Sequence, residues 1–266
     1  MFKNFLVEKS YYIAKVIINR PEKRNAMNKD LFIELKRVFH ELNEDPEVRV
    51  IILTGTKIGD KEFFSAGIDI NELAQFGGDI GLTEIRHYSK QLQEGISAVE
   101  MTEKPVIALL NGYCFGSGFE LALACDFRVA SSKTQVGLLE TSIGLIPDLG
   151  GITRIVKTLG TSIAKKVILT SDKFNAEESL QLGLVDWVYE PTEVEDKAFE
   201  LANKLLRNAP LALGVAKRTI DQVYGQTQET GLLIEQLAQL ELLKTEDTRE
   251  AFLAKLEGRE PDFKGK

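Results

Sequence analysis

Residues 111–120 read NGYCFGSGFE and lie between an apolar run at 105–110, which favours a β-strand, and a run at 119–124 that is helical in composition. The three glycines let the chain turn tightly and present the unpaired N–H groups of the helix start to an anion. This stretch therefore predicts an oxyanion site, although an ordinary strand-to-helix turn would use the same glycines. A dinucleotide-binding turn is disfavoured because Leu121 stands where that fingerprint requires its third glycine.

Strands and helices alternate on both sides of this turn. Residues 12–19 and 48–54 are β-favouring runs, and between them Asn28 can cap a helix whose apolar positions recur with helical spacing. A strand, helix, strand order within roughly fifty residues favours parallel strands joined by a crossover. The alternation continues with a helix at 85–101 and short strands at 127–130 and 134–139.

After Gly150 the expected elements are mostly helical. The apolar pattern predicts helices at 153–159, 161–169, 176–182, 195–206, 211–223 and 231–256. Asn175 and Glu178 form a capping-box pattern ahead of the third of these helices, and Gly183 is a suitable stop for it. The sequence therefore predicts an α/β part followed by a helical part.

The composition narrows the possible classes of protein. A chain of 266 residues with 44% hydrophobic and 27% charged content is typical of a soluble globular protein. No apolar stretch is long enough to span a membrane, and residues 1–10 lack the pattern of a signal peptide, so we expect a cytoplasmic protein with no membrane partner. A net charge of -7 and a pI near 5.2 argue against a nucleic-acid partner.

The cysteines and histidines exclude further kinds of chemistry. Cys114 and Cys125 both fall in apolar stretches, which indicates reduced, buried thiols rather than a disulfide framework. His40 and His87 are far apart in the sequence, so they predict neither a histidine-rich metal site nor a partner for a serine or cysteine nucleophile. We expect no bound metal.

Three acidic residues near the glycine-rich turn are candidates for proton transfer. Glu120 lies in the first turn of the following helix, Glu140 follows an apolar run, and Asp148 precedes Leu149-Gly150-Gly151. An acid among apolar residues is costly to bury unless it is paired or its pKa is shifted, and such a shift suits catalysis near neutral pH. Stabilisation of a helix dipole, a salt bridge and a helix cap are the structural alternatives for the three acids in turn.

Two further loops carry groups that could bind a ligand. Residues 63–70, FFSAGIDI, form a small-residue loop that can present another backbone N–H group, with Asp69 as a cap for the helix that follows. Residues 20–26, RPEKRNA, gather three cations beside a turn, which would suit a phosphate on an otherwise acidic protein. A solvated loop explains the same charges.

Together these motifs resemble the crotonase, or enoyl-CoA hydratase/isomerase, superfamily over essentially the whole chain. Residues 19–27 are similar to the early signature of the superfamily, and 64–70 to its first oxyanion loop. Residues 111–126 are similar to its glycine-rich turn and helix, and 137–151 to its second acidic loop.

The resemblance implies an α/β fold with a crotonase-like ββα spiral core, here residues 1–200, and a C-terminal helical trimerisation region, residues 201–266. It also implies a homotrimer or a dimer of trimers. The ligands would be acyl-CoA thioesters, as in fatty acid metabolism, and no cofactor beyond the CoA of the substrate is expected.

The resemblance also assigns roles to individual residues. The backbone N–H groups of Ile68 and Ser117 would bind the thioester oxygen, and Glu120 and Glu140 match the two acids of 2-enoyl-CoA hydratases. The glutamates would hold a water molecule between them, with Glu140 as the acid that protonates the α carbon. Two fixed N–H donors would stabilise the enolate that develops during water addition.

The expected substrate-binding residues come from four places in the chain. Ala66 and Ile68 would line the adenine pocket, and the segment from Arg20 to Arg24 would approach the CoA phosphates. Ala26, just after it, is a further substrate-binding candidate. Phe252 and Lys255, near the C-terminus, could reach the CoA of a neighbouring subunit. The segment 74–88 would border the acyl pocket.

The sequence departs from the hydratase pattern at two positions. Ser117 stands where many hydratases have glycine, which a backbone donor tolerates if its φ does not require glycine. Asp148 stands where a typical hydratase has glycine, and an acid here resembles dienoyl-CoA isomerases. The alternative is therefore a double-bond isomerase in which Glu140 and Asp148 shuttle a proton, although that subgroup has aspartate at the position of Glu120. A non-enzymatic RNA-binding protein is disfavoured by the acidic net charge and by the presence of both glutamates.

Overall fold

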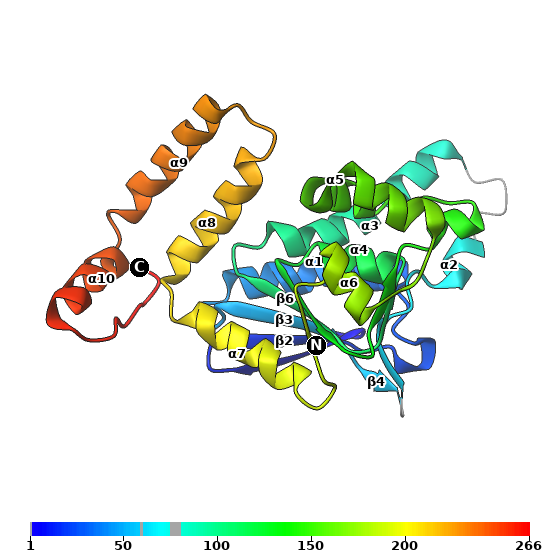
Figure 1. Cartoon of the computed structure of the whole chain (residues 1–266), viewed down its shortest axis with the longest axis horizontal. Coiled ribbons are helices and arrows are strands. Elements are labelled where there is room, and N and C mark those ends of the chain that lie inside the picture. Colours follow the sequence, from blue (N-terminus) through cyan, green and yellow to red (C-terminus); the bar gives the residue numbers. More distant parts are fainter. Residues whose placement is uncertain (1, 59–60, 75–80) are drawn as a thin grey trace.

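The computed structural model describes residues 2–58, 61–74 and 81–266, whose strands form two sheets (Figure 1). The larger sheet has the order β1 (Phe5–Ser10), β2 (Ile13–Ile18), β3 (Val50–Gly55), β6 (Val106–Leu110), β8 (Phe127–Ser131) and β11 (Trp187–Tyr189). The smaller sheet has the order β10 (Phe174–Asn175), β9 (Gln135–Gly137), β7 (Tyr113–Phe115), β5 (Lys61–Ser65) and β4 (Lys57–Ile58).

The helices cover these sheets and continue into a C-terminal region. They are α1 (Lys29–Glu44), α2 (Ile70–Ala74), α3 (Leu82–Met101), α4 (Ser117–Leu123), α5 (Gly151–Thr170), α6 (Ala176–Leu182), α7 (Val194–Leu206), α8 (Pro210–Val223), α9 (Gln228–Leu242) and α10 (Glu246–Glu257). Two short 3-10 helices, η1 (Pro21–Lys23) and η3 (Glu140–Ile143), lie in loops.

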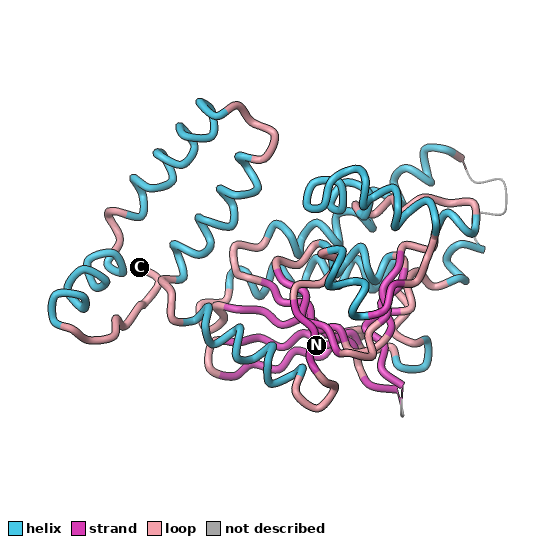
Figure 2. The backbone as a smooth tube through the Cα atoms, in the orientation of Figure 1, coloured by secondary structure: helices cyan, strands magenta, loops and turns pink. Residues whose placement is uncertain are grey.

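The parallel strands of the larger sheet are buried on both faces. In β3, Ile51 and Leu53 pack into the main core beneath α1, whereas Val50 and Ile52 face α7 on the other side. This explains why the strand is a continuous apolar run rather than an alternating one. Figure 2 shows the strands between α7 on one side and α1, α3 and α4 on the other.

The chain winds through both sheets in repeated turns. β3 is followed by β5 and α3, β6 by β7 and α4, and β8 by β9 and α5. Within each sheet the corresponding strands are parallel neighbours, since β3 pairs with β6 and β6 with β8, while β5 pairs with β7 and β7 with β9. The predicted ββα spiral core is therefore confirmed, and the loops that leave the smaller sheet are stacked in successive turns.

Several predicted elements are confirmed with small differences in extent. Asn28 caps α1, because its side chain accepts a hydrogen bond from the Leu31 N–H group. The helices expected at 153–159 and 161–169 form α5, which is interrupted at Gly160 by a φ of 80° and a ψ of 170°. Of the segment 74–88, residues 75–80 lie outside the described residues, and Leu82 begins α3.

The C-terminal helices project from the core (Figure 1). The Lys217 ammonium of α8 donates to the Asp126 carboxylate at 2.8 Å and so ties the helix to the end of β6. The boundary expected at residue 200 falls inside α7, whose apolar face packs on the larger sheet, and the projecting helices begin at Pro210.

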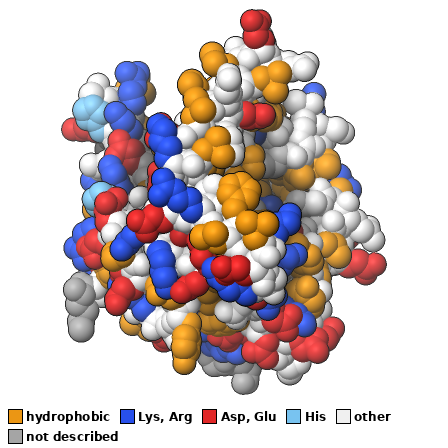
Figure 3. All heavy atoms as spheres, turned by 90° about the vertical axis from the view of Figure 1, so that its left-hand side faces the viewer, with side chains coloured by type: hydrophobic (Ala, Val, Ile, Leu, Met, Phe, Trp, Pro, Cys, Tyr) orange, Lys and Arg blue, Asp and Glu red, His pale blue; other side chains and the backbone are white. Residues whose placement is uncertain are grey.

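The segment 231–256, expected to be mostly helical, contains two helices, α9 and α10. The chain breaks between α9 and α10, where the side chain of Thr245 accepts a hydrogen bond from the Thr248 N–H group and starts a new helix. Both helices carry exposed apolar side chains, which are Leu232, Leu233, Leu237, Leu240, Phe252, Leu253 and Leu256. Figure 3 views the molecule from the side on which these helices project and shows hydrophobic side chains among charged ones there. In the described ranges, no helix has the length and apolar character required to cross a membrane.

Candidate active site

The glycine-rich turn between β7 and α4 presents an unpaired backbone donor. Gly116 has a φ of 54° and a ψ of -130°, a conformation that essentially only glycine adopts. Its own N–H group donates to the Gly137 carbonyl, and its carbonyl accepts from the Phe119 and Glu120 N–H groups. The N–H group of Ser117, the first residue of α4, has no hydrogen-bond partner in the described part of the chain.

A second unpaired donor lies in the loop after β5. The Met27 N–H group donates to the Gly67 carbonyl and the Met27 carbonyl accepts from the Asp69 N–H group, both at 2.8 Å. This parallel bridge uses the groups on either side of Ile68 and turns the Ile68 N–H group away from Met27. Among the described residues, that N–H group also lacks a partner.

The two loops that carry these donors are in contact. A β-carbon added to Gly67 would lie 2.9 Å from the Phe115 carbonyl oxygen and 3.7 Å from the Gly116 α-carbon. Gly118, in the first turn of α4, packs equally closely on Ser65 at the end of β5. The N–H groups of Ile68 and Ser117, which directly follow Gly67 and Gly116, therefore lie in neighbouring loops. An oxyanion hole requires two donors in such an arrangement.

Glu120 is buried next to this turn, with only 1% of its surface exposed. Its Oε1 accepts hydrogen bonds from the Leu149 N–H group at 2.9 Å and the Gly151 N–H group at 2.8 Å. Burial raises the pKa of Glu120 to about 8, and the charge of Glu140 adds to the rise, whereas the two amides act in the opposite direction. No described residue donates a hydrogen bond to the second oxygen, Oε2.

Glu140 approaches the same turn from η3. A β-carbon on Gly116 would lie 3.1 Å from its Oε1, so the carboxyl group borders the glycine-rich turn directly. Its Oε2 is buried and, like the buried Oγ of Ser117, has no hydrogen-bond partner among the described groups. Burial raises the pKa of Glu140, and the charge of Asp148 acts in the same direction. Buried polar atoms without partners are rare outside functional sites, so both indicate a place where a ligand or water binds.

The two glutamates act as one titrating pair. Because burial raises both pKa values and the charge of Glu140 raises that of Glu120 further, the pair keeps one proton at neutral pH. The Leu149 and Gly151 amides partly offset this rise at Glu120 by favouring its ionised form. The site thus offers one base and one acid beside two free amides.

Asp148 lies at the edge of this pair. Its carbonyl accepts a hydrogen bond from the Gln93 side chain of α3 at 2.6 Å, and its carboxylate accepts one from Ser89. Burial of the carboxyl group raises the pKa of Asp148, and its charge raises the pKa of both glutamates. In the ranges that the structure describes, no three His, Cys, Asp or Glu side chains form a group able to hold a metal ion.

Comparison with known proteins decides the family. The sequence profile of the Enoyl-CoA hydratase/isomerase family matches residues 8–266. The chain belongs to this family. It is therefore an enzyme of the enoyl-CoA hydratase/isomerase type, as the motifs around both oxyanion loops indicated.

Individual relatives of the enoyl-CoA hydratase/isomerase family match over nearly the full length. Short-chain-enoyl-CoA hydratase of Clostridium acetobutylicum is 38% identical over 256 residues, which cover 96% of this chain and 95% of the relative. Crotonyl-CoA hydratase of Syntrophomonas wolfei is 35% identical over 98% of each chain. The crystal structure of enoyl-CoA hydratase from Bacillus anthracis has a TM-score of 0.91 at 34% identity, covering 99% of this chain and 100% of that one. The predicted crotonase-type fold with its C-terminal helical region is confirmed.

The structure places several of the predicted CoA-binding residues together. The Ala66 N–H group donates to the Arg24 carbonyl at 3.1 Å, and Ala26 is followed by Met27, which bridges to Ile68. The Arg24 side chain is exposed and its guanidinium lies 5.9 Å from the centre of the Phe63 ring. Their roles in binding CoA remain predictions.

Arg20, one of the three cations expected to be available to a phosphate, is instead engaged within the protein. Its guanidinium pairs with the Asp69 carboxylate at 3.2 Å and donates to the Ala26 carbonyl, so it joins the two loops instead of facing solvent. Asp69, expected only as a helix cap, is the acidic partner of this ion pair as well as an acceptor for the Asn71 N–H group.

Phe252 and Lys255 do not join the site within one chain. Both lie on α10, which is at the opposite end of the molecule from α2 and the oxyanion loops (Figure 1). Phe252 is 62% exposed. Their predicted contact with the CoA of a neighbouring subunit stays a prediction.

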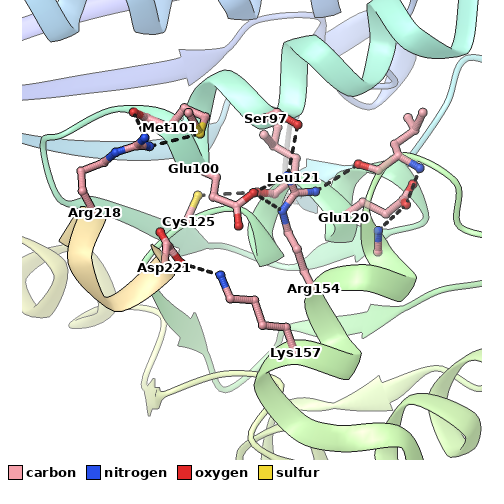
Figure 4. Close-up of polar contacts among 12 residues, drawn as sticks. Ser97, Glu100, Met101, Glu120, Leu121, Cys125, Arg154, Lys157, Arg218 and Asp221 are labelled. Carbon is pink, nitrogen blue, oxygen red and sulfur yellow. Dashed lines mark hydrogen bonds and ion pairs between the residues drawn. The ribbon is translucent and has the colours of Figure 1, made fainter. Parts of the chain in front are cut away.

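The main feature that the sequence did not predict is the support for Glu120. Its amide partners come from Leu149 and Gly151, and the Leu149 carbonyl is in turn held by Arg154 of α5 (Figure 4). The only sign of this support in the sequence was the Gly150-Gly151 pair, because two glycines allow the backbone to approach a neighbouring side chain closely. A β-carbon on Gly151 would lie 2.8 Å from both Cγ and Oε1 of Glu120.

Proposed function

We propose that this chain is an enoyl-CoA hydratase that adds water across the 2,3 double bond of an α,β-unsaturated acyl-CoA thioester. The observation that carries the proposal is the pair of buried glutamates beside two unpartnered backbone amides in contacting loops. The names of the hydratase relatives support the same reaction and direct the first tests to short 2-enoyl thioesters.

The reaction follows from the charges that each step creates. The Ile68 and Ser117 N–H groups donate to the thioester oxygen, which becomes negative as water attacks the β carbon. Glu120, ionised and held by two amides, removes a proton from that water. Glu140 supplies its proton to the α carbon, and the thioester is restored. The proposed chemistry needs no cofactor beyond the CoA of the substrate.

Mass analysis of the product tests the proposal. Incubation with crotonyl-CoA should give a product heavier by one water and should remove the ultraviolet absorbance of the conjugated thioester. Unchanged crotonyl-CoA after incubation with folded protein would contradict the hydratase assignment.

A double-bond isomerase is the second candidate function, because the charge of Asp148 acts directly on Glu140. In that reaction Glu140 and Asp148 would move a proton along the acyl chain without adding water. A dienoyl-CoA product of unchanged mass but altered retention would favour it. The variant Glu120→Gln separates the two, since it should abolish hydration but leave a shuttle between Glu140 and Asp148 largely active.

We also propose that the exposed apolar side chains of α9 and α10 are covered in a homotrimer or a dimer of trimers. Many exposed apolar side chains on two neighbouring helices are characteristic of an interface. Sedimentation should therefore show no monomer at micromolar concentration.

A further inference from the structure

Arg154 lies buried behind the loop that holds Glu120. Its guanidinium donates to Glu100 Oε2 from Nε at 3.1 Å and from Nη2 at 2.8 Å, and Nη2 also lies 3.4 Å from Ser97 Oγ. Its third nitrogen, Nη1, donates to the Leu149 carbonyl at 3.1 Å. Figure 4 shows the side chain of Arg154 reaching from α5 toward Glu100 and Ser97 of α3, with Glu120 close by.

The Leu149 residue joins Arg154 to Glu120. Its carbonyl accepts from Arg154, whereas its N–H group donates to Glu120 Oε1 at 2.9 Å. Gly150 follows with a φ of 106°, and a β-carbon there would lie 1.9 Å from Arg154 Nη1, so the guanidinium packs directly on the turn. Gly151 then supplies the second amide to Glu120 at 2.8 Å.

We propose that Arg154, itself fixed by Glu100, is a positioning residue that holds the Leu149 and Gly151 amides against Glu120. This role of Arg154 rests on the proposed function at one point, namely that Glu120 is the base of the reaction. Arg154 does not contact the reacting atoms, because the Leu149 to Gly151 turn lies between it and the carboxylate.

The consequence concerns which glutamate keeps the shared proton. Besides the amides, the charged groups that face Glu120 are Glu140 and Asp148, and both disfavour its ionised form. The two amides are the hydrogen bonds that oppose them. If the turn moves, the pKa of Glu120 rises further, and the fraction of the pair in which Glu120 is ionised and can act as the base falls.

The test uses Arg154→Lys and Glu100→Gln with Arg128→Lys as the matched control. Arg128 is also buried and binds an acid and two carbonyls, those of Leu184 and Cys125, but it lies away from the site. We expect kcat for crotonyl-CoA hydration to fall about 10- to 100-fold in both test variants with KM within about threefold, as for a misplaced catalytic group. The high-pH limb of the rate profile should move upward in both, whereas Arg128→Lys should lower the melting temperature without moving the limb.

An infrared titration of the carboxyl groups makes the inference independent of turnover. The Glu120 band is assigned by its loss in Glu120→Gln, and it should titrate at higher pH in Arg154→Lys than in the native protein or Arg128→Lys. An unchanged titration and an unchanged kcat in Arg154→Lys would overturn the positioning role even if the protein is a hydratase. A shifted titration in a protein that does not hydrate crotonyl-CoA would overturn the proposed function and retain the positioning role.

Discussion

The segments that carry Glu120 and Glu140 are built differently although they meet at one site. Glu120 lies on α4, is 1% exposed, and has one oxygen fixed by two backbone amides. Glu140 lies at the start of a short 3-10 helix, is only partly buried, and has one oxygen without a partner in the described chain. The carboxylate of Glu120 is held by two donors that favour its ionised form, whereas the described chain gives Glu140 Oε2 no donor.

This difference explains how two chemically identical side chains can take opposite roles. The environment, not the residue type, decides which acid is ionised. The site supplies two amides to Glu120, the proposed base, and places Glu140, the proposed acid, against the glycine-rich turn.

Replacing either glutamate by glutamine should have the largest effect. Hydration by Glu120→Gln and by Glu140→Gln should fall by about 10²- to 10⁴-fold, the usual contribution of a positioned acid or base. The two variants should differ in a second assay, the exchange of the α protons of a saturated acyl-CoA in deuterated water. Glu140→Gln should lose this exchange and Glu120→Gln should largely retain it. Equal loss of exchange in both variants would contradict the assignment of separate roles.

A substitution at Gly116 should disturb the Glu140 side and the oxyanion hole together. In Gly116→Ala the added carbon would meet Glu140 Oε1 at 3.1 Å and strain a backbone with a φ of 54°. We expect kcat/KM to fall about 100-fold, comparable to the loss of one oxyanion donor.

Gly225→Ala is the control for this substitution, since it has a φ of 77° but nothing within 4 Å of the new carbon. It should cost about 1 kcal/mol of stability through strain alone and leave activity intact. Activity of Gly116→Ala equal to that of Gly225→Ala would show that the turn does not form the site.

Asp148→Asn should change the pH dependence more than the rate. The charge of Asp148 raises the pKa of both glutamates, so its removal lowers them and the pair loses its last proton at lower pH. The high-pH limb of kcat/KM, which reports the loss of the last proton from the pair, should therefore move down. A collapse of activity with an unmoved limb would instead indicate that Asp148 itself transfers a proton, as in the isomerase alternative.

Ser117→Ala should have the smallest effect. The proposed donor is the backbone N–H group, which alanine keeps, and the absence of Ser117 from the positive-φ positions means that glycine is not required there. The buried Oγ has no partner in the part of the chain described, so its removal should leave the free energy of unfolding unchanged or raise it by about 1 kcal/mol. A decrease in kcat beyond about tenfold would show that the hydroxyl takes part, since a lost neutral hydrogen bond accounts for about that factor.

The central strands of the larger sheet could be predicted from the sequence, whereas in the smaller sheet only β9 was expected, within residues 134–139. β3 and β6 are fully buried on both faces and form continuous apolar runs, which mark them as strands. β7 is three residues long and contained in the glycine-rich stretch that we interpreted only as a turn. Its strand conformation depends on pairing with β5 and β9, which are distant in the sequence.

The candidate site, like the fold, could be predicted from the sequence only in part. Glu120 and Glu140 stood out because an acid among apolar residues calls for a chemical explanation, and their proximity is what the resemblance implied. The amides that hold Glu120, however, belong to Leu149 and Gly151, about thirty positions further along the chain, and backbone donors have no residue-type signature. Nothing in the sequence distinguishes Arg154 from other helical arginines, because its role follows from its contacts with the Leu149 carbonyl and the Glu100 carboxylate.

A crystal structure with bound acetoacetyl-CoA tests the central claim most directly. The account predicts that the thioester oxygen lies about 3 Å from the N–H groups of both Ile68 and Ser117, with the carboxyl groups of Glu120 and Glu140 facing the β and α carbons from one side. A thioester oxygen bound elsewhere, or glutamates on opposite sides of the acyl chain, would contradict it.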